Sequence, residues 1–172
     1  MSWNSGARST KKYGLTFLWI FLLTAADQLS KMMAESALKN QGPIVLIPNI
    51  FQLEYLENQG AAFGILQDQR LVFFVITVAA LIGLTFLYIR IPNKLRYRPM
   101  EGCYILFTAG ALGNFIDRVM QGYVIDFFYF KWIDFPIFNV ADIYVTAAVI
   151  LMLVLILFYY DEEELDFVGR RK

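Results

Sequence analysis

Hydrophobic and polar positions divide the chain into four long apolar runs separated by more polar segments. The runs cover about residues 13–33, 71–91, 102–120 and 138–160. Each is about 20 residues long, the length at which a helix crosses the roughly 30 Å hydrocarbon core of a bilayer. The pattern predicts an all-α integral membrane protein with four transmembrane helices, built as one domain over residues 1–172.

The segment between the first two runs has the pattern of strands. Residues 44–47 and 50–55 are rich in β-branched and aromatic side chains and flank a Pro48-Asn49 turn. We therefore expect a small extracytoplasmic β-element over about residues 44–66, resting on the outer membrane surface. Residues 122–137 carry many aromatic side chains, and we expect them to form a second outer loop at the membrane interface.

Composition supports a membrane protein and narrows its partners. The chain is 58% hydrophobic and 17% charged, too little charge to cover a soluble core of this size. Its formal net charge is zero, so no bulk attraction to nucleic acid is expected. Lipid is the predicted neighbour of the apolar surface, and nothing in the sequence implies an oligomer.

Histidine and cysteine, which often act as catalytic residues or metal ligands, are absent or nearly absent. There is no histidine, which excludes Ser-His-Asp and Cys-His triads and histidine-based zinc sites. The single cysteine, Cys103, cannot form an intrachain disulfide. Catalysis must then rest on carboxylates, lysine, serine, threonine or tyrosine, and no metal or cofactor is predicted.

The basic residues predict the orientation in the membrane. If both termini are cytoplasmic, ten of the fifteen lysines and arginines lie on the cytoplasmic side, four of them in the short loop 90–98. The first run resembles a cleavable signal peptide in its basic start. However, Asp27, Gln28 and Lys31 occupy the place of a small-residue cleavage site, so we expect this run to be retained.

Four carboxylates fall at one depth in this arrangement. Asp27 lies about 21 Å above Tyr13, and Asp117 lies about 24 Å above Glu101, at 1.5 Å per residue. Asp142 is in the first turns of the fourth run, and Asp126 is in the loop before it. Ionisable groups at membrane depth usually face a protein interior and have partners, so these four should converge near the outer boundary.

Structural roles compete with catalytic ones at these positions. Asp27 and Lys31 are spaced i, i+4 on one helix face, as a local structural ion pair would be, and this spacing leaves a functional role equally open. Asp117 and Arg118 favour structural pairing with neighbours. Asp126 and Asp142 have no obvious local cation, which is typical of an acid/base pair as well as of unpaired structural acids.

The polar residues occur in short strings whose order is informative. The strings are D-Q-L-S-K at 27–31, N-Q-G-A-A-F at 58–63, G-N-F-I-D-R at 113–118, V-I-D-F at 124–127 and F-N-V-A-D at 138–142. Together they resemble the motifs of lipoprotein signal peptidase, the type II signal peptidase of bacteria. The resemblance covers about residues 13–160, and five motifs in order make it specific.

The resemblance implies roles for individual residues. Asp126 and Asp142 match the catalytic aspartate pair of the family. The residues that match its site-lining or substrate-binding positions are Asn58, Gly60, Asn114, Arg118 and Asn139. Those that match its structural support are Asp27, Lys31 and Asp117.

The resemblance also implies an activity. Members are aspartic endopeptidases of the bacterial cytoplasmic (inner) membrane that use no cofactor. They remove the signal peptide from diacylglyceryl-modified prolipoproteins by cutting just before the lipidated cysteine, at a site near the extracytoplasmic face. Which aspartate starts protonated is left open by the sequence. We further hypothesise that Phe51, Tyr55 and Phe63 form an apolar cradle over the substrate.

Three other functions compete with this one. A proton-coupled transporter would use intramembrane carboxylates, but four helices without repeats suit it poorly. A serine/lysine peptidase would use Ser30 and Lys31, but adjacent helical residues point about 100° apart. A membrane scaffold without activity explains the apolar runs and leaves the five motifs unexplained.

Overall fold

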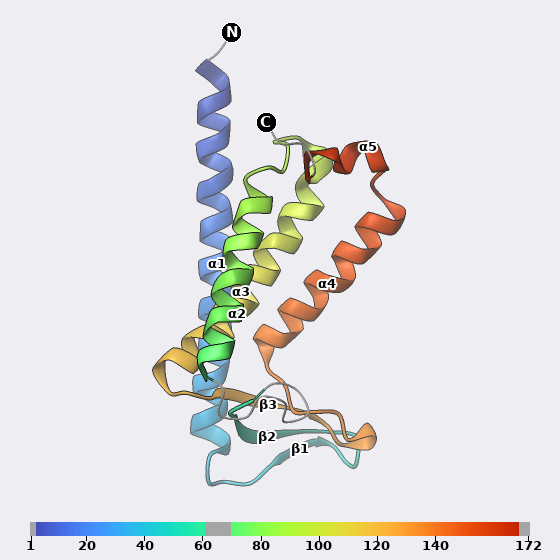
Figure 1. Ribbon diagram of the computed structural model, residues 1–172. Coiled ribbons are helices and arrows are strands. Elements are labelled where there is room, and N and C mark those ends of the chain that lie inside the picture. The colour runs from blue at the N-terminus through green and yellow to red at the C-terminus, as the bar shows by residue number, and fades with distance from the viewer. Residues whose placement is uncertain (1–2, 61–69, 169–172) are drawn as a thin grey trace.

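The structure is a computed structural model that describes residues 3–60 and 70–168. Four long helices and a small sheet make up most of it (Figure 1). The elements in chain order are α1 (Trp3–Leu38), β1 (Ile44–Ile47), β2 (Phe51–Asn58), α2 (Arg70–Tyr88), η2 (Leu95–Tyr97), α3 (Arg98–Met120), β3 (Val124–Phe130), η3 (Lys131–Ile133), α4 (Val140–Phe158), α5 (Glu162–Leu165) and η4 (Asp166–Val168).

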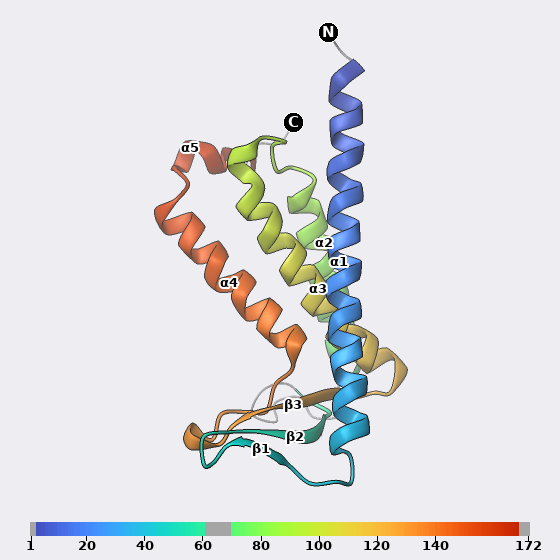
Figure 2. The same ribbon diagram turned by 180° about the vertical axis from the view of Figure 1, so that it is seen from behind.

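Helices α2, α3 and α4 stand on one side of the sheet, and the C-terminal end of α1 reaches down beside it (Figures 1 and 2). Helices α1, α2 and α3 run side by side, and α4 packs against α3 while leaning away from the others toward the end opposite the sheet (Figures 1 and 2). The start of α1 and the short helix α5 both lie at that opposite end. The two ends of the described chain are therefore on the same side of the bundle.

The helices begin and end at different residues from the apolar runs, because polar flanks, a proline and a helix cap set their boundaries. Helix α1 extends well beyond the predicted 13–33, because flanking polar residues also continue the helix. Helix α3 begins before 102, with Pro99 in its first turn, where the missing N–H of proline costs nothing. Helix α4 begins after Asn139, which caps it together with Asp142, the third residue of the helix.

Two of these helices are long and apolar enough to cross a membrane among the residues that the structure describes. They are Leu71–Tyr88 in α2 and Val140–Phe158 in α4, and both are largely exposed. Helices α1 and α3 have sufficient length, but polar side chains such as Lys31 and Asn114 interrupt their apolar character. The membrane character is therefore supported by α2 and α4, and the crossing of the membrane by α1 and α3 stays a prediction.

The sheet contains the predicted β-element between the first two long helices and one further strand. Strands β1 and β2 pair around the Pro48-Asn49 turn as predicted, and Asn49 has a positive φ of 60°. The expectation that residues 122–137 form only a loop is wrong, because residues 124–130 form β3 and pair antiparallel with β2. The β-branched and aromatic residues of this segment favour a strand, but its partner lies some 70 residues away in sequence.

Glycines allow close approach at the centre of the bundle. A Cβ atom on Gly110 would lie against the carbonyl oxygen of Ala141, and one on Gly113 would collide with the carboxylate of Asp27. Helix α3 can therefore approach α4 and α1 closely only because these positions lack a side chain. This contact brings polar groups of α1, α3 and α4 within hydrogen-bonding reach.

Candidate active site

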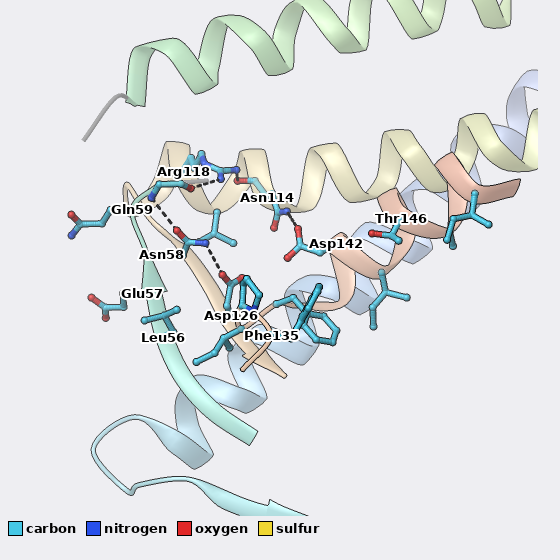
Figure 3. A pocket seen from close by; sticks show the side chains of 18 residues that line it. Leu56, Glu57, Asn58, Gln59, Asn114, Arg118, Asp126, Phe135, Asp142 and Thr146 are labelled. Atoms are coloured by element: carbon cyan, nitrogen blue, oxygen red, sulfur yellow. Dashed lines mark hydrogen bonds between the residues drawn. The ribbon is translucent and has the colours of Figure 1, made fainter. Parts of the chain in front are cut away.

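A cavity of about 1030 Å³ opens where the sheet meets α3 and α4 (Figure 3). Its polar wall is formed by the end of β2, by β3 and by α3. Its apolar wall descends along α4 through Ile143, Ala147 and Ile150. The spacing of these three residues places them on one face of the helix, continuous with Asp142. The cavity therefore joins a group of carboxylates to an apolar surface.

Asp126 lies on β3 opposite Leu56 and is 1% exposed. One carboxylate oxygen accepts a hydrogen bond from the Asn58 amide at 2.8 Å, and the other accepts one from the Asn139 amide at 2.6 Å. Burial, followed by the negative charge of Asp142, raises the pKa of Asp126 to about 7, against the opposing effect of these hydrogen bonds. The carboxyl group of Asp126 therefore keeps its proton up to about neutral pH.

Asp142 is the third residue of α4 and is half-buried. Its Oδ2 accepts the backbone N–H of Asn139 at 3.2 Å, while the Asn139 side chain accepts the N–H of Asp142 at 3.0 Å. Its Oδ1 accepts a hydrogen bond from the Asn114 amide at 2.7 Å. Asp142 therefore caps its own helix and faces the cavity at the same time (Figure 3).

A buried cluster of charges lies behind the two aspartates. The ammonium of Lys31 is 2.9 Å from Asp27 and 2.9 Å from Asp117, and all three side chains are at most 4% exposed. Asp27 accepts the backbone N–H of Ala141 at 2.9 Å, and Asp117 accepts that of Ile125 at 3.2 Å. These two N–H groups immediately precede Asp142 and Asp126, so the cluster fixes the backbone at both.

Arg118 closes the polar wall. Its guanidinium donates to the carbonyl oxygens of Gly60 at 3.3 Å and Asn114 at 3.4 Å, and it lies 4.6 Å from the centre of the Phe73 ring. Its positive charge acts on Asp142 and Asp126. Gly60 in turn donates its N–H to Asn58 at 3.0 Å. The end of β2 is therefore tied to α3 beside the two carboxylates.

Most of the predicted site residues meet in this cavity. It is lined by Asn58, Gly60, Asn114, Arg118, Asp126 and Asp142. Asn139 was expected to line the site as well, but it is 0% exposed and lies behind both aspartates. As the N-cap of α4, its side chain must turn back toward the helix, and this removes it from the cavity surface.

The proposed aromatic cradle is not supported. Phe51 packs against Phe128 and Phe130, and Tyr55 lies beside Lys39, so neither lines the cavity. Phe63, the third residue of that hypothesis, lies outside the described residues. The apolar wall instead includes Phe135 and the α4 face, which sequence reasoning missed, although the helical spacing from Asp142 was visible in the sequence.

Comparisons with known proteins point to one family. The sequence profile of the family described as signal peptidase (SPase) II matches residues 19–158. A lipoprotein signal peptidase of Streptococcus pneumoniae (strain ATCC BAA-255 / R6) is 43% identical over 139 residues, which is 81% of this chain and 90% of the relative. One of Brevibacillus brevis (strain 47 / JCM 6285 / NBRC 100599) is 40% identical over 136 residues, covering 77% and 90% of the two chains.

Solved structures show the same fold. A bacterial membrane enzyme solved by the in meso method at 2.3 Å resolution superposes with a TM-score of 0.76 at 34% identity, covering 92% of this chain and 93% of the other. A second, at 1.9 Å resolution, has a TM-score of 0.74 at 36% identity, with coverage of 86% and 95%. Sequence and structure agree that this chain belongs to the signal peptidase II family of bacterial membrane peptidases.

Proposed function

We propose that this chain is an aspartic endopeptidase that removes the signal peptide from prolipoproteins, cutting just before a diacylglyceryl-modified cysteine. One observation carries the catalytic type. Asp126 and Asp142, from β3 and α4, line one cavity, and each has both carboxylate oxygens engaged by amide N–H donors. Two carboxylates that face each other share a proton near neutral pH, as an acid/base pair requires.

The chemistry follows from that shared proton. The ionised carboxylate takes a proton from a water molecule held between the two, and the water oxygen attacks the scissile carbonyl carbon. The protonated carboxyl group gives its proton to the carbonyl oxygen. When the tetrahedral intermediate collapses, the C–N bond breaks and the leaving nitrogen receives the proton taken from water. The products are a signal peptide with a new carboxylate and a lipoprotein with a free amino group.

The surrounding residues have supporting roles in this proposal. Asn58 and Asn114 hold the carboxylates in place through their amide groups. Arg118 supplies positive charge where the carbonyl oxygen becomes negative, which lowers the energy of the transition state. Gly60 brings backbone to the cavity edge without a side chain. Asp27, Lys31 and Asp117 fix the backbone beneath the pair.

The chain is placed in the membrane with both termini cytoplasmic and the site near the outer face. Helices α2 and α4 have the apolar length to cross a bilayer, and α1 and α3 run beside them with their polar residues turned toward the site. The basic loop 90–98 lies at the end opposite the sheet. All four long helices then cross the membrane.

The apolar wall suits a lipid-modified substrate. From Asp142 to Ile150 the wall runs about 12 Å along α4 toward the membrane centre, at 1.5 Å per residue. An acyl chain or the apolar part of a signal peptide can lie there while water reaches the carboxylates from the sheet side. The substrate therefore approaches from the bilayer and the water from outside.

Cleavage of a diacylglyceryl-modified prolipoprotein by the purified protein in detergent tests the proposal. Asp126→Asn and Asp142→Asn keep the side-chain shape and remove the acid/base function, so both variants should fold and lose activity. Asp134→Asn is a matched control, because the exposed Asp134 side chain accepts a hydrogen bond from Tyr129 and is not among the described residues that line the cavity. Near-normal turnover by either dyad variant would remove that residue from the proposed catalytic pair.

A further inference from the structure

The two proposed catalytic carboxylates have different surroundings. Asp142 is half-buried in the first turn of α4, where the free backbone N–H groups of the helix start favour negative charge. Asp126 is almost fully buried on a strand, and its hydrogen-bond donors are the neutral amides of Asn58 and Asn139. Asp126 forms no ion pair among the described residues, and its burial, which disfavours ionisation, outweighs the opposing charge of Lys31. The fold therefore favours the ionised form at Asp142 and the protonated form at Asp126, although both side chains are aspartates.

Asn114 adds a directional contact to this difference. Its side-chain oxygen accepts hydrogen bonds from the ammonium of Lys31 at 3.0 Å and from the amide of Asn139 at 3.1 Å. An amide oxygen engaged by two donors fixes which way the amide group points. The NH₂ group of Asn114 must then face Asp142, where it donates at 2.7 Å. Lys31 thus orients a donor toward Asp142 without touching it.

Cations also act on the pair. The positive charge of Arg118 acts on both Asp142 and Asp126. The remaining charged groups around the pair are Asp27 and Lys31 of α1, Asp117 of α3 and Glu57 of β2. Glu57 lies 3.1 Å from Lys39. Among these described groups, Arg118 interacts with both aspartates, and the charge of Lys31 opposes only part of the effect of burial on Asp126.

We infer that Asp142 is the ionised base that activates water, that Asp126 carries the proton delivered to the scissile carbonyl oxygen, and that Asn114, oriented by Lys31, is the positioning residue that stabilises the ionised Asp142. This assignment rests on the proposed aspartic mechanism and adds the direction of proton flow. The raised pKa of Asp126 agrees with it.

Proton transfers balance in this direction. Asp142 removes a proton from water as the water oxygen bonds to the carbonyl carbon, and Asp126 transfers its proton to the carbonyl oxygen. On collapse, Asp142 gives its proton to the leaving nitrogen, and the hydroxyl proton of the intermediate returns to Asp126. Each carboxyl group ends in the state in which it began.

Infrared difference spectroscopy of the protein without substrate tests the assignment. At about pH 5, between the ordinary carboxyl pKa and the raised one, the wild-type spectrum should contain the carbonyl stretch of a protonated Asp126. That band should be lost in Asp126→Asn and retained in Asp142→Asn, which should instead lose carboxylate absorption. Loss of the band in Asp142→Asn alone, in both variants or in neither would overturn the assignment.

The cleavage assay separates this failure from failure of the proposed function. If both variants are inactive and the band follows Asp142, the aspartic mechanism stands and only the direction is wrong. If either variant cleaves normally, the aspartic mechanism itself is wrong.

Asn114→Leu tests the positioning role. Removing the donor to Asp142 should make that carboxylate harder to ionise. The acidic limb of the pH profile of kcat/KM should therefore move upward by about one pH unit, with about a tenfold loss of kcat/KM on that limb. Gln28→Leu is the matched control, since this half-buried amide donates to Asp27, Gly113 and Asp117 and to neither proposed catalytic residue. An acidic limb that stays in place in Asn114→Leu, or moves equally in Gln28→Leu, would contradict the role.

Discussion

Asp27 accepts the backbone N–H of Ala141 at 2.9 Å, although the two residues are separated by 114 positions in the chain. Ala141 precedes Asp142, so a side chain of α1 fixes the start of α4 where a proposed catalytic residue stands. Asp117 makes the equivalent contact with Ile125, the residue before Asp126. Lys31 holds both acids, and the backbone beneath the pair is therefore set by a single buried cluster.

Lys31→Met should leave two buried carboxylates without their cation. Loss of one partner of a buried ion pair typically costs about 3–5 kcal/mol of stability, so thermal unfolding in detergent should occur at a clearly lower temperature and activity should be lost. Lys39→Met is the matched control, because Lys39 forms the same i, i+4 contact with Glu35 on the exposed surface. A Lys31 variant as stable as the Lys39 variant would show that the cluster does not support the fold.

The alkaline limit of activity should be set by Asp126. Because its pKa is raised to about 7, the shared proton is lost as the pH rises through that value, and kcat/KM for a lipidated substrate should fall there. Stability should change in the same direction. The folded chain binds this proton more tightly than the unfolded chain, so the contribution is fully present below the ordinary pKa of 3.8 and is lost as the pH rises through about 7.

The free energy of unfolding, measured across this pH range, checks the predicted fall in stability. Asp126→Asn should flatten the change in stability between about pH 4 and 7, since the titrating group is gone. If the variant keeps the wild-type slope, another group is responsible for it.

Asn139 should show separable structural and catalytic effects. Asn139→Ala removes the N-cap of α4 and the donor to Asp126, and it should cost about 1–2 kcal/mol of stability together with activity. Asn139→Ser keeps a capping oxygen but cannot donate across to Asp126 as the amide does. The serine variant should therefore unfold near the wild-type temperature and still cleave slowly, and equal loss of stability in both variants would argue against this division.

Gly113→Ala tests the close approach of α3 to α1. The added methyl group would collide with the carboxylate of Asp27, which is held by Lys31 and Ala141 and has little room to move. We expect a lower unfolding temperature and loss of cleavage. Gly102→Ala, in the same helix with nothing near its Cβ, should be neutral or more stable by roughly 0.5–1 kcal/mol. Equal behaviour of the two variants would exclude the steric explanation.

Much of the architecture was available from local patterns. Helices α2 and α4 follow directly from uninterrupted apolar runs, since only a helix satisfies every backbone group of such a run in lipid. The hairpin of β1 and β2 follows from strand-forming residues around a proline-asparagine turn. The spacing of Asn139 and Asp142 is that of a helix cap, which places the start of α4 within a residue or two.

The sequence alone also determined which polar residues would gather, because ionisable groups at membrane depth need one another. Tertiary structure decided how they are arranged. Strand β3 exists because β2 is available to pair with it, and that pairing buries Asp126. Asn139 leaves the cavity wall because a cap turns its side chain inward. The difference between Asp126 and Asp142 depends on contacts among α1, α3, β3 and α4, which spacing along a chain does not encode, since hydrogen bonds and burial depend on three-dimensional distance.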